Sequence, residues 1–245
     1  MKKKSKFPSA EALVKEAYSV LPKADLNSLH STTFKVMLKY KQEYYKEKVK
    51  DFLNRVSVSR ILSPKLKASL TVEMLKPLSI SNEKKTIVYS NFMEEASRRI
   101  SQVFQPISGN VAESCIEIKL REAGLKKDIN YKRKYDRSDF TFFHPDFKSP
   151  SNIQRIEVKN VALRERGVRG LSFDGDSMIG FFNDAKEFTR ETVKIIDKHC
   201  RKYGGYCYVP PEVLKEILSK HKAKRFKPNE EFVNDMKHFV ESGTI

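Results

Sequence analysis

The stretch SDFTFFHPDFKSPSNIQRIEVKN, residues 138–160, contains two short runs rich in aromatic and β-branched residues, and both runs carry carboxylates. Such runs, DFTFFHP first and RIEVKNVAL second, predict strands. Successive side chains of a strand point to opposite faces, so Glu157 and Lys159 share one face of the second strand. Asp139 opens the first strand. The sequence therefore predicts two carboxylates and a lysine on adjacent strands.

The residues before this stretch predict one helix and one further strand. SGNVAESCIEIKLREAGL, residues 108–125, is typical of a helix that Ser108 or Asn110 opens and Gly124 closes. DINYKRKYD, residues 128–136, follows it with an extended pattern. We therefore expect a helix and three consecutive strands in this part of the chain.

The residues after it alternate between helix and strand. We interpret residues 172–184 as loop and expect helices at 184–204, 211–221 and 229–241, with a strand at 206–210. This order predicts the α/β class, with a central mixed sheet flanked by helices.

The N-terminal part of the chain has a mostly helical pattern. We expect a long helix at residues 31–56, a short helix at 64–77, a connector at 78–90 and another helix at 91–104. The lysines that crowd the long helix are interpreted as a solvated face. We expect a helical region at 1–90 that contacts DNA or a second subunit, and the core domain at 91–245.

The charge of the chain favours a polyanionic partner. Its 245 residues include 48 Lys and Arg against 31 Asp and Glu, a formal net charge of +17. Such an excess is typical of proteins that bind nucleic acid or an anionic membrane surface. No apolar run approaches the ~20 residues of a spanning helix, so we expect no membrane-spanning segment.

The cysteines and the basic start of the chain favour a cytoplasmic protein. Cys115, Cys200 and Cys207 form no CxxC pair and are odd in number, which argues against a disulfide framework or a zinc site. The start, MKKKSKFPSAEALVKEAYSVL, lacks the apolar run of a signal peptide. The five histidines show no metal-binding spacing.

Clustered carboxylates in a nucleic-acid-binding protein make chemical sense when a cation lies between them and the phosphate. Mg²⁺ prefers oxygen ligands and usually takes one or two carboxylates. A lysine beside them can orient or deprotonate a water and offset charge on the reacting phosphate. A helical wheel puts Glu113 at the edge of the apolar face of helix 108–125, so Glu113 is a third candidate.

The pattern of Asp139, then Glu157-Val158-Lys159 on the next strand, with Glu113 on a preceding helix, resembles the PD-(D/E)xK nuclease superfamily. Within it the pattern is most similar to type II restriction endonucleases, over residues 108–210. The resemblance implies a restriction-endonuclease-like core with a central mixed sheet flanked by helices. Ser138 stands where the family's motif has proline.

The resemblance also implies roles for single residues. Asp139 and Glu157 would ligate Mg²⁺, Lys159 would be the catalytic lysine, and Glu113 matches an acid that many members carry on a helix. Asp136 and Asp146 are alternatives to Asp139, although both are expected in loops.

Three further groups of residues allow two interpretations each. RERGVRG, residues 164–170, is either a DNA-contacting loop through its arginines or a flexible charged loop; the three arginines are Arg164, Arg166 and Arg169. Asp174 and Asp176 are interpreted as turn residues rather than calcium ligands. The aromatic cluster of Phe181, Phe182 and Phe188 is interpreted as core rather than as a base-stacking platform.

We therefore expect a Mg²⁺-dependent, sequence-specific endonuclease that hydrolyses double-stranded DNA to leave 5′-phosphates. We expect it to act as a homodimer, because cutting both strands of a palindrome needs two sites related by a two-fold axis. The alternatives are a structure-specific or repair nuclease on the same core, and a non-catalytic, basic, helical nucleic-acid-binding protein.

Overall fold

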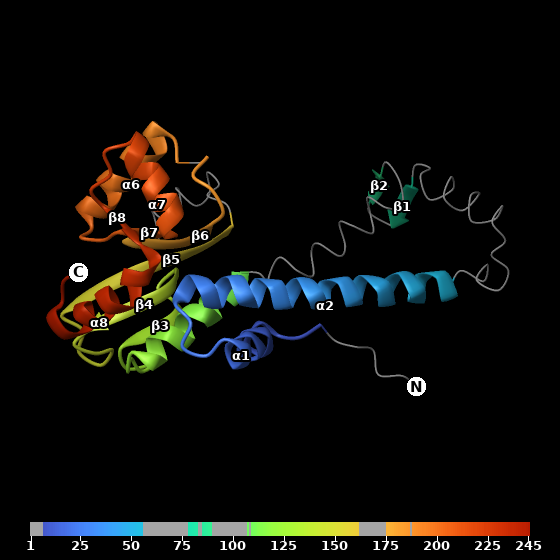
Figure 1. Cartoon of the computed structure of the whole chain (residues 1–245), viewed down its shortest axis with the longest axis horizontal. Coiled ribbons are helices and arrows are strands. Elements are labelled where there is room, and N and C mark those ends of the chain that lie inside the picture. Colours follow the sequence, from blue (N-terminus) through green and yellow to red (C-terminus); the bar gives the residue numbers. More distant parts are fainter. Residues whose placement is uncertain are drawn as a thin grey trace. The chain divides into compact units, whose positions relative to one another are not determined.

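The computed structural model describes residues 7–55, 78–82, 85–89, 107, 109–161, 175–186 and 188–245 (Figure 1). The chain forms two compact units. One comprises residues 1–9 and 36–107, and the other comprises residues 10–35 and 108–245. The expected division at residue 90 stays a prediction.

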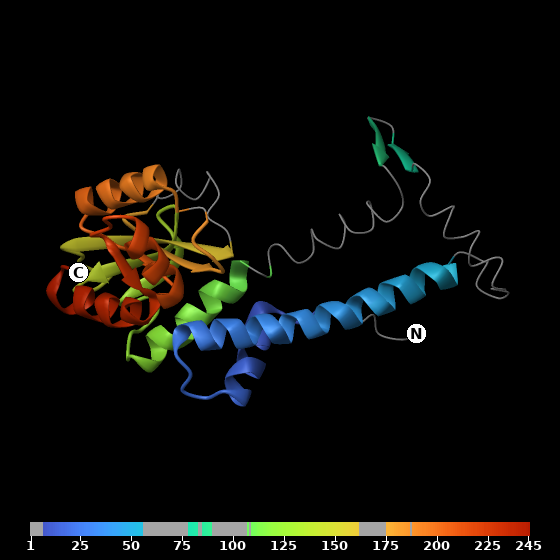
Figure 2. The same cartoon turned by 45° about the horizontal axis from the view of Figure 1, so that its top comes forward.

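The first unit contains a two-stranded hairpin. β1 (Leu78–Asn82) pairs with β2 (Lys85–Tyr89) in antiparallel register, seen in teal in Figure 2. The expectation of a connector at 78–90 was therefore wrong. The helices expected at 64–77 and 91–104 lie outside the described residues.

The first two helices of the chain are α1 (Ala10–Val20) and α2 (Leu26–Arg55). α2 begins five residues ahead of the expected start at 31, because Asp25 caps it. The Asp25 carboxylate accepts hydrogen bonds from the Ser28 backbone N–H at 2.9 Å and from the Ser28 hydroxyl at 2.6 Å. A carboxylate at this position satisfies free N–H groups of the first turn and favours the positive end of the helix.

A six-stranded mixed sheet forms the centre of the second unit. Its strands, in spatial order, are β3 (Tyr131–Tyr135), β4 (Ser138–His144), β5 (Asn152–Val161), β6 (Ser177–Phe182), β7 (Cys207–Val209) and β8 (Phe226–Pro228). β3, β4 and β5 are antiparallel neighbours, whereas β5, β6, β7 and β8 run parallel. The expected α/β class with a mixed sheet is confirmed.

Two strands of this sheet were not predicted from the sequence. β6 lies in the segment expected to be a loop, and β8 lies in a segment for which no strand was expected. All six residues of β6 are buried, as befits a central strand covered on both faces. These strands extend the parallel half of the sheet to four.

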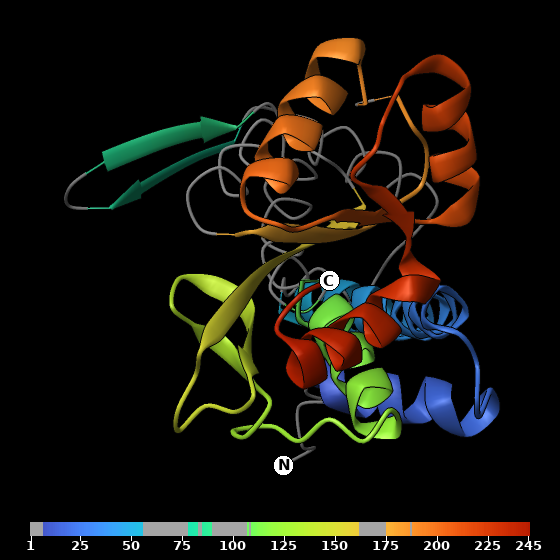
Figure 3. The same ribbon diagram turned by 90° about the vertical axis from the view of Figure 1, so that its left-hand side faces the viewer.

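Helices cover the two faces of the sheet unequally. On one face lie α8 (Phe232–Ser242), the helix at residues 109–122 and the beginning of α2. The contacts include Phe142 with Phe232, with ring centroids 6.2 Å apart, and His30 stacked on Phe181 at 4.0 Å. On the other face lie α6 (Arg190–Lys202) and α7 (Pro211–Lys220). Figure 3 shows α6 and α7 together above the strands, with the other helices below.

α6 and α7 pack over three strands of their face, β6, β7 and β8. Their buried residues form one apolar cluster with side chains of β6, β7 and β8, among them Met178, Cys207 and Phe226. α6 begins at residue 190 rather than 184, because Thr189 accepts the Thr192 N–H and caps the helix there. No residue of β4 or β5 belongs to this cluster.

Candidate active site

Asp139 and Glu157 come together through the register of β4 and β5. Phe140 is paired with Ile156 across the two antiparallel strands, at the end of their pairing. Asp139 and Glu157 are the next residues beyond that pair, so they leave the same face of the sheet. The Asp139 carboxylate accepts the Val158 backbone N–H at 2.7 Å. This side chain therefore bonds β5 directly at the point where the β-ladder stops.

Lys159 forms an ion pair with Glu157 on the same face. Its ammonium group donates to Oε1 of Glu157, and the two side chains are 21% and 16% exposed. Lys159 lies opposite Gly180 of β6, a residue without a side chain. Both groups are thus partly shielded but reachable from solvent.

The Asp139 carboxyl has a raised pKa. Burial is the largest cause, and the negative charge of Glu157 adds to it, whereas the Val158 N–H, Lys159 and Lys134 oppose the rise. Like charges close together disfavour ionisation of both. A cation held between the two carboxylates would relieve this repulsion.

The hairpin that carries Asp139 has an unusual backbone. Asp136 and Arg137 have φ values of 51° and 63°, the left-handed pair typical of a two-residue hairpin turn. Lys134 also has a positive φ, 51°, and is unpaired in the ladder between β3 and β4, although Arg133 and Tyr135 on either side of it are paired. A left-handed lysine costs about 1–2 kcal/mol. This strain lies at the residue that faces Asp139 across the hairpin.

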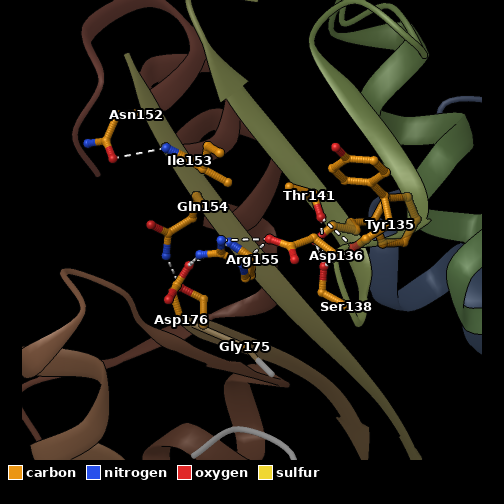
Figure 4. Close-up of polar contacts among 12 residues, drawn as sticks. Tyr135, Asp136, Ser138, Thr141, Asn152, Ile153, Gln154, Arg155, Gly175 and Asp176 are labelled. Atoms are coloured by element: carbon orange, nitrogen blue, oxygen red, sulfur yellow. Dashed lines mark hydrogen bonds and ion pairs between the residues drawn. The ribbon is translucent and has the colours of Figure 1, made fainter. Parts of the chain in front are cut away.

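Arg155, which the sequence analysis did not single out, ties three elements of the site together (Figure 4). Its guanidinium contacts the Asp136 carboxylate at 2.6 and 2.7 Å and the Asp176 carboxylate at 3.5 Å. Its backbone N–H also donates to Asp176 at 2.8 Å. Arg155 is two residues before Glu157 and therefore shares its face, a strand periodicity that could have identified it.

Glu113 lies in the helix at residues 109–122 and is 6% exposed. Its carboxylate is 2.7 Å from the Arg133 guanidinium and 3.9 Å from the Lys134 ammonium. Lys134 also acts on the charge of Asp139. Glu113 is therefore linked to the site through Lys134, and its catalytic role stays a prediction.

The alternatives to Asp139 lie outside the strands, as expected. Asp136 lies in the β3–β4 turn and is bound to Arg155. Asp146 lies in the loop after β4 and accepts the N–H groups of Lys148 and Ser149 at 2.8 and 3.1 Å. Both carboxylates thus have local structural partners.

Other candidates have mixed outcomes. Arg164, Arg166, Arg169 and Asp174 lie outside the described residues. Asp176 lies in a bend just before β6, and its carboxylate is bound to Arg155. The phenylalanines expected in the core, Phe181, Phe182 and Phe188, are all at most 4% exposed, which confirms that interpretation.

The cysteines offer no nucleophile to the site. Cys115, Cys200 and Cys207 are free and buried. Burial raises the pKa of Cys115 and that of Cys200 to about 12, so the reactive thiolate is disfavoured at neutral pH.

The donor set at the sheet edge fits a hard divalent cation. Within the described ranges, no three His, Cys, Asp or Glu side chains gather as a metal-binding group. Asp139 and Glu157 are a pair of neighbouring carboxylates, and Asp139 is destabilised in its charged form by burial and by Glu157. Mg²⁺ typically takes only one or two carboxylates and keeps several waters. The two residues are therefore suited to Mg²⁺, and unsuited to a closed zinc site.

Comparisons with known proteins support the fold. No family model matches the chain. No curated protein matches it either. Among solved structures, the chain is similar to metal-depleted Ecl18kI in complex with uncleaved, modified DNA. The TM-score is 0.67 at 14% sequence identity, over 98% of this chain and 81% of that chain.

Ecl18kI is a restriction endonuclease, so the chain has a restriction-endonuclease-like fold. The expected fold class is confirmed. The likeness extends well beyond residues 108–210, to which the sequence resemblance was confined. No helix among the described residues is long and apolar enough to cross a membrane.

Proposed function

We propose that the chain is a type II restriction enzyme of the PD-(D/E)xK superfamily. It would be a Mg²⁺-dependent, sequence-specific endonuclease that acts on double-stranded DNA. The observation that carries the proposal is the gathering of Asp139, Glu157 and Lys159 on one face of adjacent strands. No residue of β4 or β5 joins the apolar cluster of α6 and α7, and Asp139, Glu157 and Lys159 are only partly buried. The restriction-endonuclease-like fold supports a nuclease.

Each residue of the site has a role that its environment supports. Asp139 and Glu157 would hold Mg²⁺, which supplies charge stabilisation at the phosphate and acidifies a bound water. Lys159, beside Glu157, would orient the attacking water or take its proton and offset negative charge on the phosphate. Hydrolysis would leave a 5′-phosphate and a free 3′-hydroxyl. Glu113 would act on the site indirectly, by holding Lys134, whose positive charge acts on Asp139.

Arg155 would position the two ligands relative to each other. It binds the turn that precedes Asp139 and the residue that precedes β6, and it belongs to the strand of Glu157. Rigid support of this kind keeps reacting groups within the small tolerance that catalysis needs.

The charge and geometry of the target suggest the partners. The net charge of +17 suits DNA phosphates. A homodimer would offer two sites for the two strands. Arg164, Arg166 and Arg169 would contact DNA next to the catalytic strand.

Incubating plasmid with the protein and Mg²⁺ tests the proposal directly. Discrete bands support a restriction enzyme. A smear, or nicking selective for unusual DNA structures, supports a repair or structure-specific nuclease, and a gel shift without cutting supports a binding protein. Asp139→Ala and Glu157→Ala should abolish cutting while binding is retained or tightened, since each removes a metal ligand and a charge that repels phosphate.

Thermal unfolding provides a second measurement that does not depend on activity. Mg²⁺ bound to the folded state should stabilise the wild type by about 2.7 kcal/mol at 100 times its Kd. Asp139→Asn should lose that increment. An equal stabilisation of both proteins by Mg²⁺ would show that Asp139 is not a ligand of the ion.

A further inference from the structure

A groove of about 750 Å³ lies between α6 and the residues that follow α7. Six exposed cations line it: Arg190, Lys194, Lys198, Arg201, Lys220 and Lys222. The buried face of α6 packs against β6 and β7 through Val193, Ile196 and Cys200. All the lining residues of the groove lie at positions 190–201 and 220–222, so the groove shares no residue with the site around Asp139 and Glu157.

Three of the cations on α6 are not explained by the stability of the helix. Arg190, Lys194 and Lys198 follow one another at four-residue intervals, about 6 Å along the axis. Like charges at this spacing destabilise a helix by about 0.2–0.5 kcal/mol per pair. Arg190 is also the first residue of α6, where the helix dipole disfavours a cation. A bound polyanion would offset both costs.

The acidic residue in the groove does not neutralise these cations. Asp197 is 8% exposed, and its Oδ1 accepts the backbone N–H groups of Lys224 and Arg225, both at 2.7 Å. Its Oδ2 accepts from Arg201 at 2.7 Å. The carboxylate thus fastens the chain after α7 to α6, which fixes the two walls of the groove.

Most of the lining cations have no acidic partner. Lys220 is paired with Glu216 at 2.6 Å, and Arg201 with Asp197. Within the described part of the chain, no carboxylate lies within 4.0 Å of the charged groups of Arg190, Lys194, Lys198 or Lys222. Four positive charges are therefore available to an external ligand.

We propose that this groove binds the phosphate backbone of double-stranded DNA, separately from the catalytic residues. A row of cations on one straight helix face suits a regular polyanion. The cations of α6 repeat about every 6 Å along the helix axis, which suits the evenly spaced phosphates of a nucleic-acid strand better than the unordered head groups of a membrane surface. The proposal goes beyond the cutting reaction and holds whether or not the chain cuts DNA.

Matched charge-reversal variants test the groove. One carries Lys194→Glu, Lys198→Glu and Lys222→Glu. The control carries Lys126→Glu, Lys148→Glu and Lys237→Glu, three exposed lysines outside the groove. Both lower the net charge equally. Circular dichroism verifies folding, and a Lys→Gln version of the groove set replaces the first variant if that one fails to fold.

Fluorescence anisotropy with a labelled duplex, without divalent cation, measures affinity across a salt series. The groove variant should bind at least ~10-fold more weakly at low salt, and its log–log salt slope should be shallower by roughly 2.7, or 0.9 for each lost phosphate contact. The control should change far less. Equal losses of affinity in both variants would overturn the proposal, because the net charge of the protein alone would then explain its binding to DNA.

Two further measurements separate the competing explanations. Phosphatidylserine vesicles should bind both variants more weakly than the wild type and to the same extent, because both variants carry the same net charge; a larger loss in the groove variant on vesicles, with DNA binding intact, would overturn the assignment to DNA. Under single-turnover conditions at saturating enzyme, the groove variant should cut at the wild-type rate. A slow rate at full occupancy would instead put these lysines in the catalytic site. If the wild type does not cut at all, the endonuclease proposal fails while the anisotropy series still decides the groove.

Discussion

Lys159 is the residue whose substitution discriminates best between catalysis and simple charge attraction. It is ion-paired to Glu157 and shares its strand face. If Lys159 orients or deprotonates the attacking water, Lys159→Arg should fail, because a guanidinium is planar, wider and does not lose its proton near neutral pH. We expect Lys159→Ala and Lys159→Arg each to lose at least ~100-fold in cleavage rate, with DNA binding retained.

Single-turnover cleavage at saturating enzyme, with a gel shift alongside, measures these two effects separately. Near-normal cutting by Lys159→Arg would show that Lys159 contributes only its positive charge. Near-normal cutting by Lys159→Ala would show that Asp139, Glu157 and Lys159 do not form the active site. Lys215→Arg, at an exposed lysine of α7, is a matched control for the substitution itself.

His30 predicts how the stability of the chain depends on pH. Burial lowers its pKa from 6.5 to about 4, against a smaller opposing effect of a hydrogen bond with Asn160. Its ring is stacked on Phe181 at 4.0 Å. Because the folded state holds the neutral ring, the unfolded state gains a proton first as pH falls, and stability is lost from about pH 6.5 down to about 4.

His30→Phe should keep the ring stack and remove this dependence. Between pH 7.5 and 5 we expect the wild type to lose about 2 kcal/mol relative to the variant, as follows from 1.36 kcal/mol per pKa unit. Urea unfolding at both pH values measures the difference. Parallel stability curves for the two proteins would show that His30 is protonated as readily in the folded chain as in the unfolded one.

At the scale of single residues, the sequence predicted what strand periodicity determines. Glu157 and Lys159 share a face because they are two residues apart, and Asp139 opens the neighbouring strand. Arg155 obeys the same periodicity but was missed, since its partners Asp136 and Asp176 come from a turn and from a strand that had not been expected. The left-handed conformation of Lys134 has no signal in the residue type.

At the scale of elements, the sequence predicted helices with clear caps better than short strands. α7 and β7 were expected within a residue or two of their observed ends. β6 was missed because it contains Gly180 and follows an Asp- and Gly-rich run, both typical of loops. Its glycine makes room for the ring of Phe182, two residues further along the same strand, which a Cβ at Gly180 would overlap. β1 and β2 lack the Asn-Gly or Asp-Gly pair that indicates a hairpin.

Gly205 joins α6 to β7 and lies against the beginning of β6. A Cβ added there would overlap the Asp176 carbonyl oxygen and the Ser177 hydroxyl. Because the carbonyl belongs to the backbone, it cannot move aside without shifting β6. We expect Gly205→Ala to destabilise the fold by about 1–3 kcal/mol, the usual cost of overpacking.

Gly109→Ala is the matched control, since no atom lies within 4 Å of the added methyl group. It should be neutral or stabilise the helix at 109–122 by up to about 1 kcal/mol. Urea unfolding of both variants gives the comparison. Equal stabilities would mean that the junction of α6 with β6 is loose enough to accept a side chain.

At the scale of the whole molecule, the proposed homodimer predicts how two sites share one substrate. If each subunit cuts one strand, a dimer with one inactive subunit should nick a plasmid and release it rather than linearise it. Wild-type protein mixed with a tenfold excess of Lys159→Ala consists mostly of inactive and mixed dimers, so open-circular plasmid should accumulate. Wild type alone at the same active concentration should give linear DNA directly.

Because Lys159 lies within its own subunit's sheet, beside Glu157, exchange of subunits cannot restore the missing lysine to the inactive half. Linear product from the mixture, at the rate of the diluted wild type, would indicate that one chain cuts both strands in turn and that the second subunit is not needed.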